Sequence, residues 1–139
     1  MTERRYAEKT TAPVSQSTAE VKDLLKKAGA VQTAILETAA ATLVLFVLAG
    51  RQYRLTVPLR ADAKNPEQEE RRGWRLMLLL IKAKCEAIRE GVSTVEREFM
   101  ADVVMPNGQT FAEYAEPTLR VAYETGAMPT QLLLGGPSK

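Results

Sequence analysis

Residues 42–58 constrain the fold of this chain more than any other segment. Residues 42–48 form an unbroken apolar run that is rich in strand-favouring side chains. Residues 51–58 alternate, with aromatic and aliphatic side chains on one face and polar ones on the other. Ala49 and Gly50 between them are typical of a tight turn. The segment therefore predicts a β-hairpin whose first strand must be covered on both of its faces.

A third strand is expected just before this hairpin. Val31, Thr33 and Ile35 alternate with Gln32 and Ala34, which favours a three-stranded antiparallel meander. Helices would cover one face of this sheet. The other face would be covered by the C-terminal region or by a second subunit.

One helix is predicted before the meander in the sequence and another after it. The first would begin at Ser17, where residues 17–20 have the pattern of a capping box, and would end at Gly29. The second would begin at Asn65-Pro66 and continue to Gly91. Its apolar residues recur at steps of three and four and predict a face packed on the sheet: Trp74, Met77, Leu78, Ile81, Cys85 and Ile88.

Two shorter helices are expected near the C-terminus. Further capping boxes begin at Ser93 and at Thr110, and the second helix would run to about Thr125, kinked or split by Pro117. Residues 103–105 could form a short edge strand. The predicted fold class is α+β, with an α-β-β-β-α core, a three-stranded antiparallel meander, a long helix and additional short C-terminal helices. We expect a flexible basic arm at 1–16, one domain at 17–126 and an irregular tail at 127–139.

Composition mainly excludes classes of function. The chain has 139 residues, no histidine and one cysteine, so it has no imidazole base and cannot form an intramolecular disulfide or a thiolate zinc site. Its most apolar stretch, residues 39–50, is shorter than the roughly 20 residues that a membrane span needs. No apolar segment of a secretory signal follows Arg4 and Arg5. We expect a cytoplasmic protein with no membrane partner.

The modest net charge of +2 conceals an asymmetry. Residues 1–92 carry 16 basic and 11 acidic side chains, whereas residues 93–139 carry 3 basic and 6 acidic ones. On the second helix, four cations fall along one stripe, and basic residues also occur in the arm and the third strand. This distribution favours a phosphate backbone as ligand, and predicts these contacts: Arg4, Arg5, Tyr6, Lys9, Arg51, Arg54, Arg71, Arg75, Lys82 and Arg89.

The same features leave other interpretations open. The charged stripe could be an ordinary solvated helix face that is paired locally. Leu76, Leu79 and Leu80 fall largely outside the predicted core stripe of the second helix, which suggests a partner interface. We therefore expect a non-enzymatic nucleic-acid-binding protein with little sequence specificity, favouring DNA over RNA. The alternative is a module that binds and inhibits a host defence or replication protein, and a homo-oligomer is expected in either case.

Sites for chemistry are poorly supported. Glu67, Glu69 and Glu70 could offer oxygen ligands to Mg²⁺, but their place in a first helical turn already explains them. Cys85 lies on the apolar stripe of the second helix and is expected to be buried and inert. No glycine-rich phosphate loop is present. We expect no enzymatic activity, no metal and no cofactor.

Several segments resemble a family of small uncharacterised proteins from bacteriophages and prophages. The resemblance rests on residues 5–10, 17–29, 74–84 and 106–108, and implies a phage origin and action in the host cytoplasm. The predicted α-β-β-β-α order also resembles that of double-stranded-RNA-binding domains. Those domains place a lysine cluster at the start of the second helix, where this chain has residues 66–70, Pro-Glu-Gln-Glu-Glu.

Overall fold

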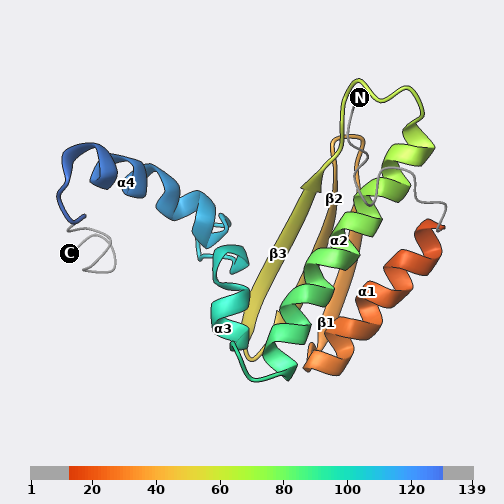
Figure 1. Ribbon diagram of the computed structural model, residues 1–139, viewed down its shortest axis with the longest axis horizontal. Helices are drawn as coiled ribbons and strands as arrows, with labels where there is room; N and C mark the ends of the chain where they lie inside the picture. The colour runs from red at the N-terminus through yellow and green to blue at the C-terminus, as the bar shows by residue number, and fades with distance from the viewer. Residues whose placement is uncertain (1–12, 130–139) are drawn as a thin grey trace.

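The computed structural model describes residues 13–129, in which two helices cover one face of a three-stranded sheet (Figure 1). The order of elements confirms the predicted α+β class and the α-β-β-β-α core. The elements are α1 (Val14–Ala28), β1 (Gln32–Glu37), β2 (Ala41–Leu48), β3 (Arg51–Pro58), α2 (Pro66–Arg89), α3 (Val95–Glu98), the 3-10 turn η1 (Met100–Asp102) and α4 (Phe111–Thr125).

The sheet is the predicted antiparallel meander, with β2 between its two neighbours. Phe46 lies opposite Thr33 on β1 and Tyr53 on β3, so these three side chains share one face. The β2–β3 turn is made by Ala49 at φ 52° and Gly50 at φ 77°. Two successive positive φ values are those of a type I′ turn, whose twist matches the flanking strands.

The core lies between the sheet and the helices. One face of β2 is buried, as are the inward side chains of β3, and α1 and α2 contribute the facing apolar residues. Within this core, Phe46 stacks on Tyr53 with ring centroids 5.2 Å apart, and Phe99 meets both rings edge-on. Trp74, Met77 and Ile81 are fully buried, which confirms the predicted core stripe of α2.

The start of α1 was predicted wrongly. The helix begins at Val14 with Pro13 at its N-cap, and no side chain caps it. Ser17 is buried within the helix, where its hydroxyl cannot serve as a cap, so α1 reaches into the segment expected to be an arm. The predicted end is correct, because Gly29 adopts φ 109°, a conformation that glycine accepts without strain.

The N-terminus of α2 agrees with its prediction. The Asn65 side chain accepts a hydrogen bond from the amide of Gln68, and Pro66 is the first helical residue. Gly73 lies where α2 approaches the sheet closely: a Cβ there would come within 2.6 Å of Leu59 Cδ2 and 3.3 Å of Thr42 Cγ2. This close packing explains a glycine in the middle of a long helix.

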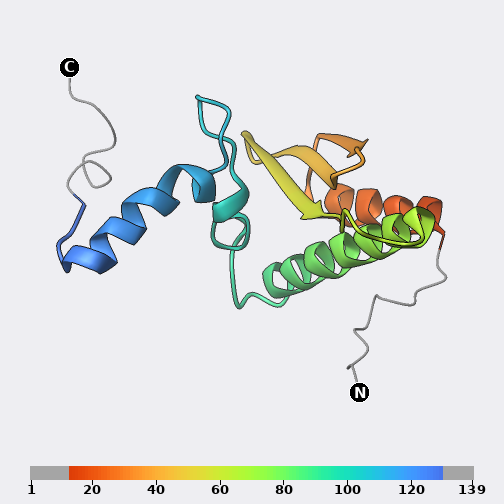
Figure 2. The same ribbon diagram turned by 90° about the horizontal axis from the view of Figure 1, so that it is seen from above.

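The C-terminal elements extend from the free edge of β3, and α4 points away from the α1–α2 pair (Figure 2). Val103 pairs with Tyr53, which confirms a minimal edge strand, and Val104 pairs with Thr110. The capping box of α4 is present as predicted at Thr110. Two details differ from prediction, since Thr94 rather than Ser93 caps α3, and Pro117 lies inside a continuous α4.

Candidate functional site

The cations predicted to bind nucleic acid are not gathered on one surface. Arg4, Arg5, Tyr6 and Lys9 lie outside the described residues. Arg54 projects from the face of the sheet opposite the helices, because its neighbours Tyr53 and Leu55 point into the core. The stripe on α2 belongs to the helical layer. The sheet therefore separates Arg54 from the stripe.

Arg54 has a structural role at the edge of the sheet. Its guanidinium donates to the carbonyl of Gly108 at 3.1 Å and to Glu113 Oε1 at 3.2 Å. The Thr110 amide, followed by the Arg54 guanidinium, lowers the pKa of Glu113. These bonds hold the turn before α4 against β3. Arg51 is exposed beside the β2–β3 turn.

The cations of α2 are interleaved with acceptors. Arg71 donates two hydrogen bonds to the Gln68 side chain, at 3.1 and 2.7 Å. Arg89 is paired with Glu86 one turn earlier. Arg75 and Lys82 line a hollow between the two helices that also receives Glu20 and Asp23 from α1. The stripe exists, but carboxylates share its surface.

The three leucines predicted to form a partner interface have different environments. Leu76 packs against the hydrophobic core. Leu79 is half-buried and lines the hollow between α1 and α2. Leu80 is 45% exposed. These residues do not form one apolar patch, since part of the surplus apolar surface inferred from sequence is used inside the protein.

Three carboxylates meet at one end of the sheet, around a cavity of about 470 Å³. Glu69 accepts two hydrogen bonds from Arg72, at 2.9 and 2.7 Å, and one from the Arg60 amide. The Arg72 bonds chiefly lower the pKa of Glu69, against the effect of its burial. Burial, and then a hydrogen bond with Glu37, raises the pKa of Glu70.

This carboxylate cluster has structural partners for its oxygens. Trp74 Nε1 donates to Glu37 Oε2 at 2.9 Å, and Glu69 is held by its arginine partner. Within residues 13–129, no group of three or more potential metal-ligating side chains has a suitable arrangement. The possible magnesium ligands, Glu67, Glu69 and Glu70, are therefore not brought together as a metal centre.

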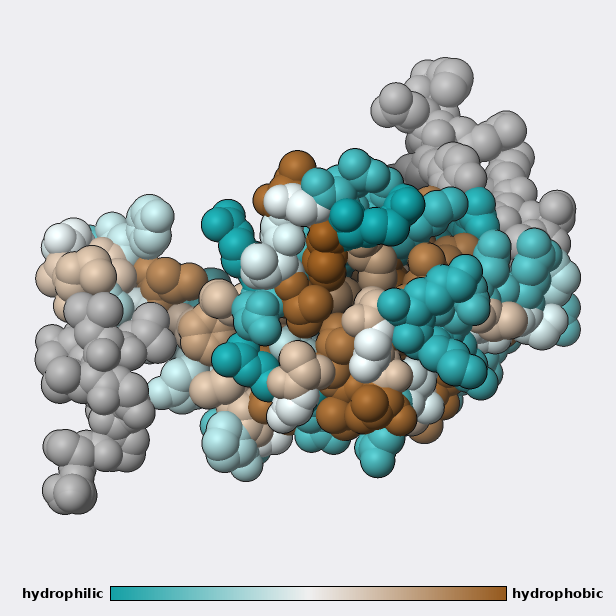
Figure 3. Space-filling model, turned by 90° about the horizontal axis from the view of Figure 1, so that it is seen from below, coloured by the Kyte–Doolittle hydropathy of each residue, from teal (hydrophilic) through white to brown (hydrophobic). Residues whose placement is uncertain are grey.

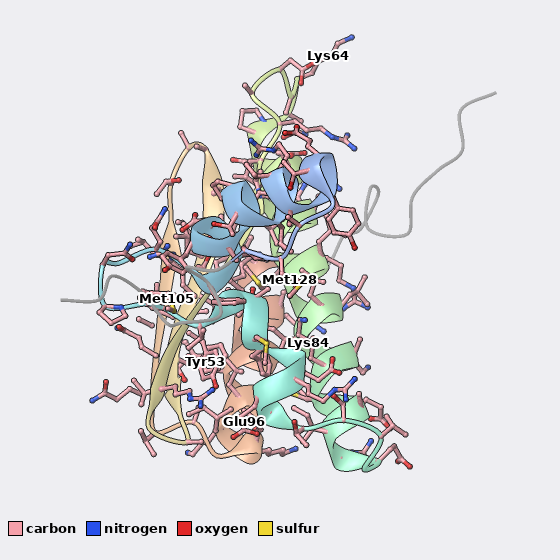
Figure 4. All side chains as sticks on the ribbon, turned by 90° about the vertical axis from the view of Figure 1, so that its left-hand side faces the viewer. Tyr53, Lys64, Lys84, Glu96, Met105 and Met128 are labelled. Carbon is pink, nitrogen blue, oxygen red and sulfur yellow. The ribbon has the colours of Figure 1, made fainter. Side chains whose placement is uncertain are left out.

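A second polar group lies where α3 and η1 pack against the sheet and α2. Lys84 Nζ donates to the carbonyl of Glu98 at 2.7 Å and lies 5.7 Å from the centre of the Phe99 ring. Burial raises the pKa of Asp102, although Lys84 partly opposes this shift. Figure 4 shows Tyr53 and Lys84 on this side of the molecule. The contacts anchor the C-terminal elements, a role that sequence alone did not indicate.

Cys85 has the environment expected of a structural thiol. It is half-buried and packs against the core, and burial raises its pKa. A raised pKa leaves less thiolate at neutral pH, which makes the sulfur a poorer nucleophile.

An apolar surface on the outer face of the sheet was only partly predicted from the sequence. Outward side chains of β1 and β2 form two cross-strand pairs, Leu36 with Leu43 and Ala34 with Leu45, and Val47 continues the face along β2. We call these five residues the open sheet face. Leu36 is 52% exposed. Both α1 and α2 lie on the opposite face, while the predicted cover by the C-terminal region is limited to the 103–110 segment along β3 (Figures 1 and 2).

The comparisons give no relative from which to transfer a role. Neither a protein-family model, nor a curated protein sequence, nor a solved structure matches this chain. No helix within residues 13–129 is long and apolar enough to cross a membrane.

Proposed function

We propose that this protein is a protein-binding module that docks its partner on the open sheet face. The observation that carries the proposal is the apolar character of this face, on which Ala34 and Leu36 are exposed and Leu43, Leu45 and Val47 are half-buried. A sheet that is apolar on both sides lowers its free energy when both sides are covered. Over β1 and β2, α1 and α2 cover only the inner side, and the contacts of Arg54 with Gly108 and Glu113 reach only the β3 edge of the outer side.

The edge of β1 adds a specific mode of recognition. β1 pairs with β2 along one side, and no described strand pairs with its other side. Natural edge strands are often protected by lysine, proline or an inward-pointing charge. β1 contains neither lysine nor proline. Its one inward-pointing charge, Glu37, is the last residue of the strand and accepts a hydrogen bond from Trp74, so residues 32–36 of the edge carry no such protection. An extended partner segment with alternating apolar residues would extend the sheet at this edge.

The proposal is tested by partner capture from a nuclease-treated extract of the host cell. Leu36→Glu places a charge on the open sheet face at an exposed position, so the fold should survive. Gln32→Glu is the matched control, because it places the same charge on the same face of the same strand. We expect Leu36→Glu to lose a stoichiometric protein partner that the wild type and Gln32→Glu retain. Equal capture by all three proteins, or no protein partner at all, would contradict the proposal.

Nucleic-acid binding is the second candidate function. It is favoured by Lys22, Lys26 and Lys82, which are exposed on the helical layer and form no ion pair with any residue of 13–129. Such cations could contact phosphates without reading sequence. Binding to a labelled DNA duplex and to the matching RNA duplex should then weaken steeply with salt.

The test of this second candidate compares charge reversal at two places. Lys22→Glu combined with Lys82→Glu should reduce affinity at least tenfold, with Lys64→Glu in the β3–α2 loop as the control. Affinity that is absent at low salt, or equal in all variants, would rule it out.

A further inference from the structure

The helix α4 lacks the packing that a helix of its length requires. An isolated helix of about 15 residues is marginally stable in water, and an internal proline such as Pro117 removes one hydrogen bond and weakens it further. Among the described elements, α4 contacts chiefly the short turn η1. Figures 1 and 2 show it extending from the β3 side of the body, away from α1 and α2.

One side of α4 presents an apolar pair to solvent. Leu119 and Tyr123 are one turn apart, and they line the same shallow hollow as Glu116, Arg120 and Glu124. Glu116 is paired with Arg120 at 3.5 Å, so Glu124 is the carboxylate of this surface without an ion pair among residues 13–129. Leu119 is 45% and Tyr123 87% exposed. Apolar side chains at positions i and i+4, with acidic side chains beside them, are typical of a helix that binds in a groove. We call residues 111–125 the α4 arm.

A groove of complementary character runs between α1 and α2, on the side away from the sheet. The groove has a volume of about 530 Å³, and Leu24, Cys85 and Ile88 form its apolar floor. Lys27, Lys82 and Arg89 stand along its rim with Glu86. Lys27 is paired with Asp23 and Arg89 with Glu86, whereas Lys82 forms no ion pair with any residue of 13–129. Figure 3 looks at the molecule from the end where α1 and α2 finish, and shows that apolar side chains are exposed among hydrophilic ones at this end. We call the hollow lined by these residues of α1 and α2 the interhelical groove.

We propose that the α4 arm of one copy of this chain binds in the interhelical groove of a second copy. Leu119 and Tyr123 would contact the apolar floor, and Glu124 would face Lys82, the rim cation that has no ion pair among the described residues. A chain's own arm leaves the body on the side of β3, so it does not lie over its own groove. A reciprocal exchange between two copies closes into a symmetric dimer. This inference goes beyond the proposed function, because neither the α4 arm nor the interhelical groove includes residues of the open sheet face.

The dimer is tested first by light scattering on the full-length chain. We expect the wild type to have the mass of a dimer at micromolar concentrations and Tyr123→Glu to have that of a monomer. Val121→Glu is the matched control: Val121 is also exposed, but helical geometry places it on a different side of α4 from Tyr123. A monomeric wild type, or equal dissociation of both variants, would overturn the proposal.

The native Cys85 provides a second measurement that identifies the groove itself. Tyr123→Cys should form a disulfide with Cys85 of the other copy under mild oxidation, whereas Val121→Cys should not. Mixing unlabelled and ¹⁵N-labelled Tyr123→Cys chains before oxidation, followed by peptide mass spectrometry, shows whether the bond joins two chains. A linked peptide carrying both labels supports the proposal. The absence of that peptide, or equal cross-linking by Val121→Cys, contradicts docking in this groove.

Discussion

At the scale of single residues, the carboxylates at the end of the sheet have opposite responses to pH. Glu69 is paired with Arg72, and its lowered pKa means that it contributes stability above the unfolded-state pKa, which is lost as pH falls through the folded-state value. Glu70 is desolvated and lies beside Glu37, and its raised pKa means that the folded state holds its proton more tightly. Stability from Glu70 is thus lost as pH rises through its folded-state pKa.

Replacing Glu70 by glutamine should therefore stabilise the protein at neutral pH. The amide can keep a hydrogen bond to Glu37 without a second negative charge. We expect Glu70→Gln to raise the free energy of unfolding at neutral pH by up to about 1 kcal/mol, the scale of one solvent-screened charge pair. The gain should shrink as pH falls through the raised folded-state pKa of Glu70 and should be gone below the ordinary glutamate pKa of about 4.3. Urea unfolding across this pH range measures it, and a gain independent of pH would contradict the assignment.

The β2–β3 turn gives a residue-scale prediction with opposite signs at adjacent positions. Ala49 has a positive φ that costs an L-residue about 1 kcal/mol, whereas Gly50 adopts its own positive φ freely. Ala49→Gly should therefore raise the free energy of unfolding slightly, after the added entropy of the unfolded chain is subtracted. Gly50→Ala should lower it by about 1 kcal/mol. Thermal unfolding of both variants checks the pair, and shifts of the same sign would argue against the turn geometry.

At the scale of elements, the sequence pattern predicted helices and strands most reliably where local chemistry and burial favour the same structure. The meander followed from alternation around residues 49 and 50, and the start of α2 from Asn65-Pro66. At Ser17 they disagreed: the capping-box pattern occurs inside a helix that begins three residues earlier. There, Val14 in the added first turn packs against the core, and Ser17 lies on the buried face of α1, so the helix extends past the serine.

The capping box at the start of α4 can be tested by mutation. The Thr110 hydroxyl accepts from the Glu113 amide, and the Glu113 carboxylate accepts from the Thr110 amide. Thr110→Ala removes the first of these bonds and should destabilise the start of α4 by about 1 kcal/mol. Hydrogen exchange should accelerate in the first turn of α4 and remain unchanged in β2. Thr118→Ala, inside the same helix, is the control. Equal acceleration by both variants would show that the cap is not the cause.

At the scale of the whole molecule, the position of the exposed apolar surface is the main reason for proposing protein binding. The charge asymmetry read from the sequence is real, but Arg54 is committed to Glu113 and Arg89 to Glu86. The need for cover on both faces of β2 could be predicted from residues 42–48. Which element would supply that cover could not, because it depends on long-range packing. The direction in which α4 leaves the body had no signal in local sequence.

The central claim is that function depends on the open sheet face rather than on the cations of the helical layer. The most direct measurement compares Leu36→Glu with Lys22→Glu combined with Lys82→Glu, each used to capture partners from the same nuclease-treated cell extract. We expect Leu36→Glu to lose the protein partner and the double variant to keep it at the wild-type level. Retention by Leu36→Glu together with loss by the double variant would contradict the claim.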